Sequence, residues 1–188
     1  MLFNYDKCKV MHFSKKHNLF NYHLKNHQLI SVTQEKDLSI LITDDLKILQ
    51  QCRQVYSKAS KMLGVINRSI VHKSKDILLS LYISLVRPHL EYCTAAWSPH
   101  YVKDKVLLEK IQHRFTCMIV GMKELPYEER LRRLGLWTLE ERRVRVDLIE
   151  VYRMSKELSK VKFDYFFEYA TDSRTRGHHL KLKKGEFT

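Results

Sequence analysis

The sequence has little glycine and little proline, and the patterns that mark most catalytic sites are missing. Five glycines and three prolines are spread over 188 residues, so no glycine-rich loop can cradle a phosphate group. No cluster of carboxylates suits a pair of metal ions either. Without a nucleophile, an acid–base pair or a phosphate loop, the residues describe a binding module as readily as an enzyme.

Cysteine and histidine are too scattered to predict a metal site. The sequence contains four cysteines that lie far apart and form no CxxC pair: Cys8, Cys52, Cys93 and Cys117. They suggest neither a zinc knuckle nor a disulfide framework, and a reducing compartment is expected. His178 and His179 are the only adjacent histidines, and no second cluster has ligand spacing. The first residues lack the apolar core of a signal peptide.

Positive charge is in excess and is concentrated in one part of the chain. The formal net charge is +13 and the pI is near 9.6. Residues 46–122 hold 12 lysines and arginines against 4 acidic residues, a net charge of +8, whereas 1–45 carries +1. Such an excess favours a polyanionic partner, with nucleic acid first and an anionic membrane surface second. The 44% hydrophobic content allows one full core.

The longest stretch with few charges, residues 77–99, predicts a bent central helix. Its apolar side chains recur at helical spacing and continue beyond a proline: Leu79, Tyr82, Ile83, Val86, Leu90, Cys93, Ala96 and Trp97. Pro88 removes a helical N–H, so the helix should kink or end near Arg87, restart, and stop at Pro99. Trp97 should be buried. Charges interrupt the stretch too often for a membrane span.

Residues 1–43 alternate polar and apolar side chains, as strands do. The segments 8–13, 22–32 and 38–42 predict strands, with a turn at Lys25-Asn26-His27. We expect a small antiparallel sheet of three strands, which is marginal by itself. The same pattern is also consistent with the edge of a larger sheet.

From Asp44 onward the apolar period becomes that of helices, which makes the predicted fold α+β and mainly α. Asp44 or Asp45 could cap a helix that continues to Ile70, a role favoured over a catalytic one. Further helices are expected from Ser74, over 103–120, and between Pro126 and Gly135. The last helix should begin at a capping box, Thr138 with Glu141, and bury a stripe on one side. That stripe comprises Leu148, Ile149 and Tyr152. Regular structure should end after Tyr169.

Six phrases of the sequence, in order, resemble one protein family. They are KCKVMHF, EKDLSILITDDLK, QCRQVYSKASKMLGVINRSI, LYISLVRPHLEYCTAAWSPHYVKDKVLLEKIQHRFTCMI, YEERLRRLGLWTLEERRVRVDLIEVYRM and TRGHHLKL. In this order they resemble the C-terminal part of reverse transcriptases of non-LTR retrotransposons of the LINE class, jockey-like or CR1-like. The resemblance covers nearly all of residues 4–184.

The resemblance implies the end of the palm and the thumb of an RNA-directed DNA polymerase. Residues 1–43 would be a partial palm with a primer-grip-like hairpin, 44–169 a helical thumb-like domain, and 170–188 a basic flexible tail. The family carries its catalytic aspartates in a Phe/Tyr-Ala-Asp-Asp turn upstream of these segments, in an N-terminal polymerase portion. This sequence has no such turn. A complete enzyme would use Mg²⁺, whereas no cofactor and no polymerase activity are expected of these residues alone.

The resemblance also assigns roles to particular residues. Lys7 aligns with a lysine near the incoming triphosphate, where it could act as an accessory general acid, although a solvated strand-end lysine is an equal alternative. The primer-grip turn would be Asp37, Leu38 and Ser39. The family usually has Leu-Gly here, so Ser39 stands in place of the glycine, and serine adopts positive φ at a higher cost than glycine. The cations expected on phosphates are Lys58, Lys61, Arg68, Lys73 and Lys75. A second basic set, Arg142, Arg143 and Arg145, has acidic neighbours and is better explained by pairing within its helix.

Two functions therefore follow from the sequence. The first is a part of a reverse transcriptase whose residual role is to bind an RNA or DNA primer–template duplex, inside the cell in the nucleus or cytoplasm and without a membrane. The alternative is a non-enzymatic, basic, helical module that binds nucleic acid or protein.

Overall fold

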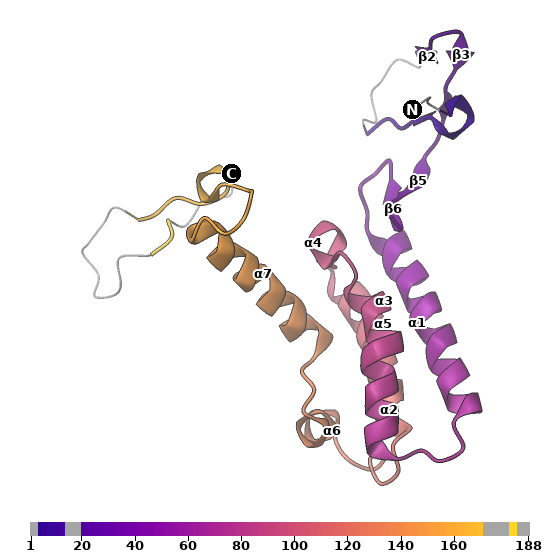
Figure 1. The fold of residues 1–188 in the computed structure, drawn as a ribbon, viewed down its shortest axis with the longest axis vertical. Coiled ribbons are helices and arrows are strands. Elements are labelled where there is room, and N and C mark those ends of the chain that lie inside the picture. The colour runs from indigo at the N-terminus through magenta and orange to yellow at the C-terminus, as the bar shows by residue number, and fades with distance from the viewer. Residues whose placement is uncertain (1–3, 14–19, 171–180, 184–188) are drawn as a thin grey trace. The chain divides into compact units, whose positions relative to one another are not determined.

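The computed structural model describes residues 4–13, 20–170 and 181–183. Contacts between residues divide the chain into two compact units, Met1–Glu140 and Glu141–Thr188. The first unit contains short β-hairpins and a helical core, so the fold is α+β and mainly α, as predicted (Figure 1). In the described part of the chain, no helix is long and apolar enough to cross a membrane.

The strands near the N-terminus form three separate two-stranded sheets. β1 (Lys9–Val10) pairs in parallel with β4 (Ile30–Ser31). The other two pairs are antiparallel, β2 (His23–Leu24) with β3 (His27–Gln28) and β5 (Gln34–Asp37) with β6 (Ile40–Thr43). The expectation of one antiparallel sheet of three strands is wrong. Large apolar side chains in and near these short strands are exposed, among them Phe13, Phe20 and Ile30. Burial of apolar surface therefore contributes little free energy in favour of one shared sheet.

The helices of the first unit surround one hydrophobic core. Their bounds are α1 (Leu49–Ser69), α2 (Lys75–Leu81), α3 (Arg87–Glu91), α4 (Thr94–Trp97), α5 (Val102–Cys117) and α6 (Tyr127–Leu134). α1 packs along α5 (Figure 1). The buried side chains of α1 recur every three or four residues, as expected for an amphipathic helix: Cys52, Val55, Ala59, Leu63 and Ile66. Gly135 ends α6 with φ 63°, as predicted.

The central stretch is interrupted as predicted, by a π-helical segment just before the proline. α2 continues into η2 (Tyr82–Val86), where the N–H of Arg87 donates to the carbonyl of Tyr82. Pro88 has no N–H and its ring crowds the carbonyl four residues earlier, so the wider turn accommodates it. The buried face is Leu78, Tyr82, Val86 and Leu90. Ile83, expected on this face, is exposed, because the π turn shifts the helical period.

The second half of the stretch is not one helix. Cys93, expected to continue the apolar run of the helix, is exposed with φ 51° and lies between α3 and α4. Trp97 is buried as predicted, with 2% of its surface exposed. Its Nε1–H donates to the backbone oxygen of Tyr92 at 2.7 Å. Trp97 therefore anchors the loop that follows α3.

A buried polar network joins η2, α5 and α6 inside the core. The hydroxyl of Tyr82 donates to Oε1 of Gln112 at 2.8 Å, and Tyr82 stacks on Phe115 with ring centroids 4.1 Å apart. Nε2 of Gln112 donates to the backbone oxygen of Trp137 at 2.9 Å. Tyr127 donates to Glu109, and burial together with this hydrogen bond raises the pKa of the Tyr127 phenol. Satisfied buried polar groups fix the arrangement of these helices.

The second unit begins within α7 (Leu139–Ser155) and continues through η3 (Phe163–Tyr165). The expectation that Leu148, Ile149 and Tyr152 are buried is wrong, since all three are exposed. Their spacing places them together on α7, but burial also needs a second element against that face. Tyr169 forms one isolated bridge with Leu182, and the loss of regular structure after Tyr169 stays a prediction, because 171–180 lie outside the described residues.

Candidate nucleic-acid interface

One face of α1 carries cations that are free to bind a partner. Arg53, Ser57, Lys61, Gly64 and Arg68 follow one another at intervals of four, four, three and four residues, so they share the side opposite the buried stripe. We call these five residues the α1 basic face. Among the described residues, none of its three cations has a hydrogen bond or an ion pair. No aspartate or glutamate occurs in residues 46–75, so neutralisation must come from outside this segment.

An open groove follows this face. It encloses about 600 Å³ and is lined by Tyr56, Ser57, Ser60, Lys61, Gly64, Val65 and Arg68. At its edge, Nη1 of Arg114 on α5 donates to the hydroxyl of Ser60 at 2.9 Å. Gly64 leaves the helix backbone bare there, because a Cβ at this position would meet only Nη1 of Arg68, 4.0 Å away. Hydroxyls, cations and accessible backbone are the groups that contact phosphates and sugars.

The five cations predicted on phosphates do not form one surface. Lys61 and Arg68 lie in the groove, whereas Lys58 lines a different cavity. Lys73 donates to Oδ1 of Asn67 at 2.7 Å, and Lys75 donates to the carbonyl of Arg133 at 2.9 Å. Both ammonium groups thus have one neutral partner and keep their charge. Lys61 and Arg68 are therefore the two members of the predicted set that belong to the α1 basic face.

The predicted primer-grip turn is the tip of the β5–β6 hairpin. Asp37 ends β5, and the turn residues Leu38 and Ser39 both have positive φ, 43° and 69°. Positive φ at both central residues is the pattern of a type I′ turn, which usually takes Asn-Gly. Ser39 thus adopts the conformation for which glycine is favoured, at a cost of roughly 1–2 kcal/mol. Such strain at an exposed tip suggests a functional constraint.

The hairpin is fixed to α1 by a side chain that is almost fully buried. Oε1 of Gln51, in the first turn of α1, accepts a hydrogen bond from the backbone N–H of Leu41 at 2.9 Å. β6 also packs against α1. The turn therefore has a defined position beside the helix that carries the α1 basic face.

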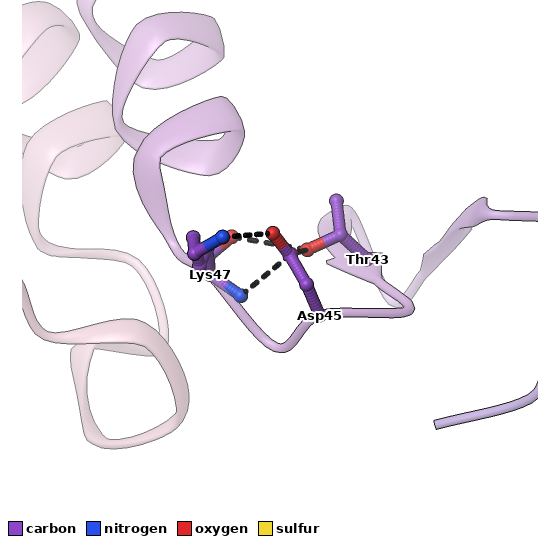
Figure 2. Close-up of polar contacts among 3 residues, drawn as sticks. All are labelled: Thr43, Asp45 and Lys47. Carbon is purple, nitrogen blue, oxygen red and sulfur yellow. Dashed lines mark hydrogen bonds and ion pairs between the residues drawn. The ribbon is translucent and has the colours of Figure 1, made fainter. Parts of the chain in front are cut away.

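Asp45 organises the loop before α1 and does not cap the helix itself (Figure 2). Oδ1 of Asp45 accepts from the hydroxyl of Thr43 at 2.8 Å and from the N–H of Lys47 at 3.0 Å. Oδ2 lies 2.8 Å from Nζ of Lys47. These contacts lower the pKa of Asp45 to about 2, with the Lys47 side chain the largest cause. α1 begins only at Leu49, without a side-chain cap at Ile48, so the expected capping role is wrong.

The same contacts show that Asp45 does not fit a catalytic metal pair with Asp44. They are the only adjacent aspartates in the sequence, and the Lys47 ammonium already neutralises Asp45. Among the residues that the structure describes, no three His, Cys, Asp or Glu side chains gather to hold a metal ion. His178 and His179 lie outside the described residues. No metal-dependent step can be assigned to these side chains.

The remaining predicted residues do not belong to the α1 basic face. Lys7 ends a short 3-10 turn, Tyr5–Lys7, with an exposed side chain, and its role beside a triphosphate stays a prediction. Arg142, Arg143 and Arg145 lie on α7, and each already interacts with another group. Arg53 and Arg114 are additions from the structure. The four-residue spacing from Arg53 to Ser57 and from Ser57 to Lys61 could have predicted Arg53. Arg114 could not be predicted in this way, because only the packing of α5 against α1 brings it to the groove.

Comparison of the chain with family models, with curated proteins and with solved structures gives no match.

Proposed function

We propose that this chain is the thumb and the adjoining palm hairpin of a reverse transcriptase of the non-LTR retrotransposon type. Its own contribution is to hold a primer–template duplex. Two independent features support the proposal. The first is the order of the six sequence phrases that resemble that family. The second is the α1 basic face, whose cations have no partner within the described part of the chain.

The α1 basic face is the observation that carries the binding function. A cation without an internal partner keeps its full charge for a phosphate, and neutralising phosphates releases the counterions condensed on nucleic acid. Lys61 and Arg68 line the open groove, and Arg53 continues the same face of α1 toward its N-terminus. Contacts of this kind are independent of base sequence, which suits a polymerase that must hold any duplex.

The β5–β6 hairpin supplies a second, smaller contact in this proposal. Its tip, Leu38-Ser39, is exposed and the hairpin is tied to α1 through Gln51. Both tip residues have positive φ, so the chain reverses there in a tight two-residue turn. We assign the tip to the strand that ends at the active site, while the α1 basic face holds the duplex behind it.

These residues alone should not synthesise DNA. Polymerisation needs two carboxylates that hold Mg²⁺ at the 3′ hydroxyl and the triphosphate. The sequence has no Phe/Tyr-Ala-Asp-Asp turn, and of its two adjacent aspartates Asp45 is paired with Lys47. We expect no nucleotide incorporation by residues 1–188 on a primed RNA template with Mg²⁺ or Mn²⁺. Incorporation that persists after contaminating polymerases are removed would contradict this assignment.

Direct binding tests the proposed function. The purified chain is titrated, at several salt concentrations, into a fluorescent RNA–DNA hybrid and separately into vesicles that contain phosphatidylserine. We expect binding to the hybrid that weakens steeply with salt and weaker binding to the vesicles. Binding to vesicles but not to the hybrid would show that the positive charge serves a membrane surface and would overturn the proposal.

The alternative, a module that binds another protein, is favoured by one observation. α7 exposes a set of large apolar side chains: Val144, Val146, Leu148, Ile149 and Tyr152. Exposed apolar clusters often mark contact surfaces. If this alternative holds, substitution of Leu148 and Ile149 by serine should leave hybrid binding unchanged and abolish association with the protein partner.

A further inference from the structure

A cavity lies where the hairpin tip, α1 and the end of α3 meet. It encloses about 410 Å³ and is lined by Ser39, Gln51, Val55, Lys58, Pro88, His89 and Tyr92. This volume falls within the range of about 300–1,000 Å³ that is usual for small-molecule sites. Segments far apart in the sequence form the cavity, so no local sequence pattern could have predicted it.

The walls of this cavity are held from behind by buried groups. Gln51 is buried and joins the hairpin to α1 through its hydrogen bond with the N–H of Leu41 at 2.9 Å. The backbone of Tyr92 accepts the indole N–H of the buried Trp97 at 2.7 Å and donates its own N–H to the carbonyl of Pro88. The cavity is therefore preformed, which lowers the entropic cost of binding.

Its lining combines an aromatic ring with unpaired cationic or donor groups. The side chain of Tyr92 is 54% exposed, so its ring can be covered by a ligand. Among the described residues, neither Lys58 nor His89 has a hydrogen bond or an ion pair through its side chain. None of the lining residues is acidic. An ammonium, an imidazole donor and a ring with a free face together suit a phosphate attached to a flat, aromatic group.

We infer that this cavity binds the unpaired nucleotide at the end of a nucleic-acid strand. The base stacks on Tyr92, and Lys58 and His89 contact its phosphate; Ser39 contributes its hydroxyl at the rim. The inference rests on the proposed function, because the duplex on the α1 basic face delivers the strand end. Lys58 is only three residues from Lys61, so one helix serves both the duplex and its end.

The test compares two duplexes of the same length and sequence with the full chain. One has an unpaired nucleotide at a strand end, and the other has the same paired sequence with blunt ends. We expect the chain to bind the duplex with the unpaired nucleotide about fivefold to a hundredfold more tightly, the contribution of one stacked base. Tyr92→Leu should lose this preference. Tyr101→Leu is the matched control, since Tyr101 is 56% exposed and lies outside the cavity; it should keep the preference.

Each other outcome has a distinct meaning. Equal affinity of the unmodified chain for both duplexes would overturn the strand-end site and leave the proposed function intact. Binding to neither would overturn both. If free deoxyadenosine monophosphate competes as well as a strand end does, the cavity is a site for free nucleotides and the inference is wrong. An unchanged preference in Tyr92→Leu, with an unchanged melting temperature, would also overturn it.

Discussion

The helices α1 and α7 are both long, charged and amphipathic, yet they use their cations differently. α1 contains no acidic residue, and its Arg53, Lys61 and Arg68 have no partner within the described residues. α7 contains both arginines and acidic residues, and Nη1 of its Arg153 lies 3.4 Å from Oε2 of Glu150. Arg142, Arg143 and Arg145 also interact with other groups.

The difference shows that a count of charges does not locate a binding surface. A cation that already has a carboxylate partner releases less free energy when a phosphate replaces that partner, because the first ion pair must be broken. The two helices also differ in the burial of their apolar side chains: α1 buries its apolar stripe, whereas α7 exposes Leu148 and Ile149. α1 is thus suited to a polyanion and α7 to an apolar partner.

The comparison depends on a stable core behind α1, and the largest effect is expected there. Trp97→Ala removes a side chain that is 2% exposed together with its hydrogen bond to Tyr92. The free energy of unfolding should fall by about 3–5 kcal/mol, which is enough to unfold a domain of ordinary stability. Trp137→Ala is the control, because Trp137 is 46% exposed and should cost less. Chemical denaturation measures both, and equal effects would contradict the described core.

Gly64→Ala should separate stability from binding on α1. Alanine is favoured over glycine within a helix by about 1 kcal/mol, and the new Cβ would meet only Nη1 of Arg68 at 4.0 Å. The variant should therefore be more stable but bind the hybrid less tightly, if the duplex approaches the bare backbone. Gly135→Ala should instead lower stability, since Gly135 has φ 63°. Unchanged hybrid affinity in Gly64→Ala would exclude close approach at this point.

A small effect of pH is expected at the start of α1. The pKa of Asp45 is lowered from 3.8 to about 2 by Lys47 and Thr43. A lowered folded-state pKa means that the contribution of this carboxylate to stability is present above pH 3.8 and is lost as the pH falls toward 2. NMR titration of the carboxyl group measures this directly. In Asp45→Asn the pH dependence of this loop should disappear, and a normal pKa for Asp45 would contradict the loop in Figure 2.

The sequence predicted those features that depend on local chemistry. Amphipathic spacing located α1 and α5, and Pro126 with Gly135 located α6. Pro88 predicted an interruption, although the form it takes, a π-helical segment, depends on how the chain relieves the crowding before the proline.

Features that depend on tertiary packing could not be predicted in this way. The stripe on α7 has helical spacing, but spacing cannot say whether another element covers it. Likewise Lys58 and Lys61 look equivalent in the sequence, yet they line different cavities. His89 and Tyr92 gain their place in a candidate site only because the end of α3 lies next to the hairpin and α1.

The salt dependence of binding tests the central claim that the free cations of α1 hold the duplex. Replacing Arg53, Lys61 and Arg68 together by glutamine should flatten the slope of log affinity against log salt by about two to three units, at about 0.9 per phosphate. The matched variant replaces Arg142, Arg143 and Arg145 by glutamine and should change the slope by less than about one unit. A larger change in this second variant would place the binding surface on α7 and contradict the account.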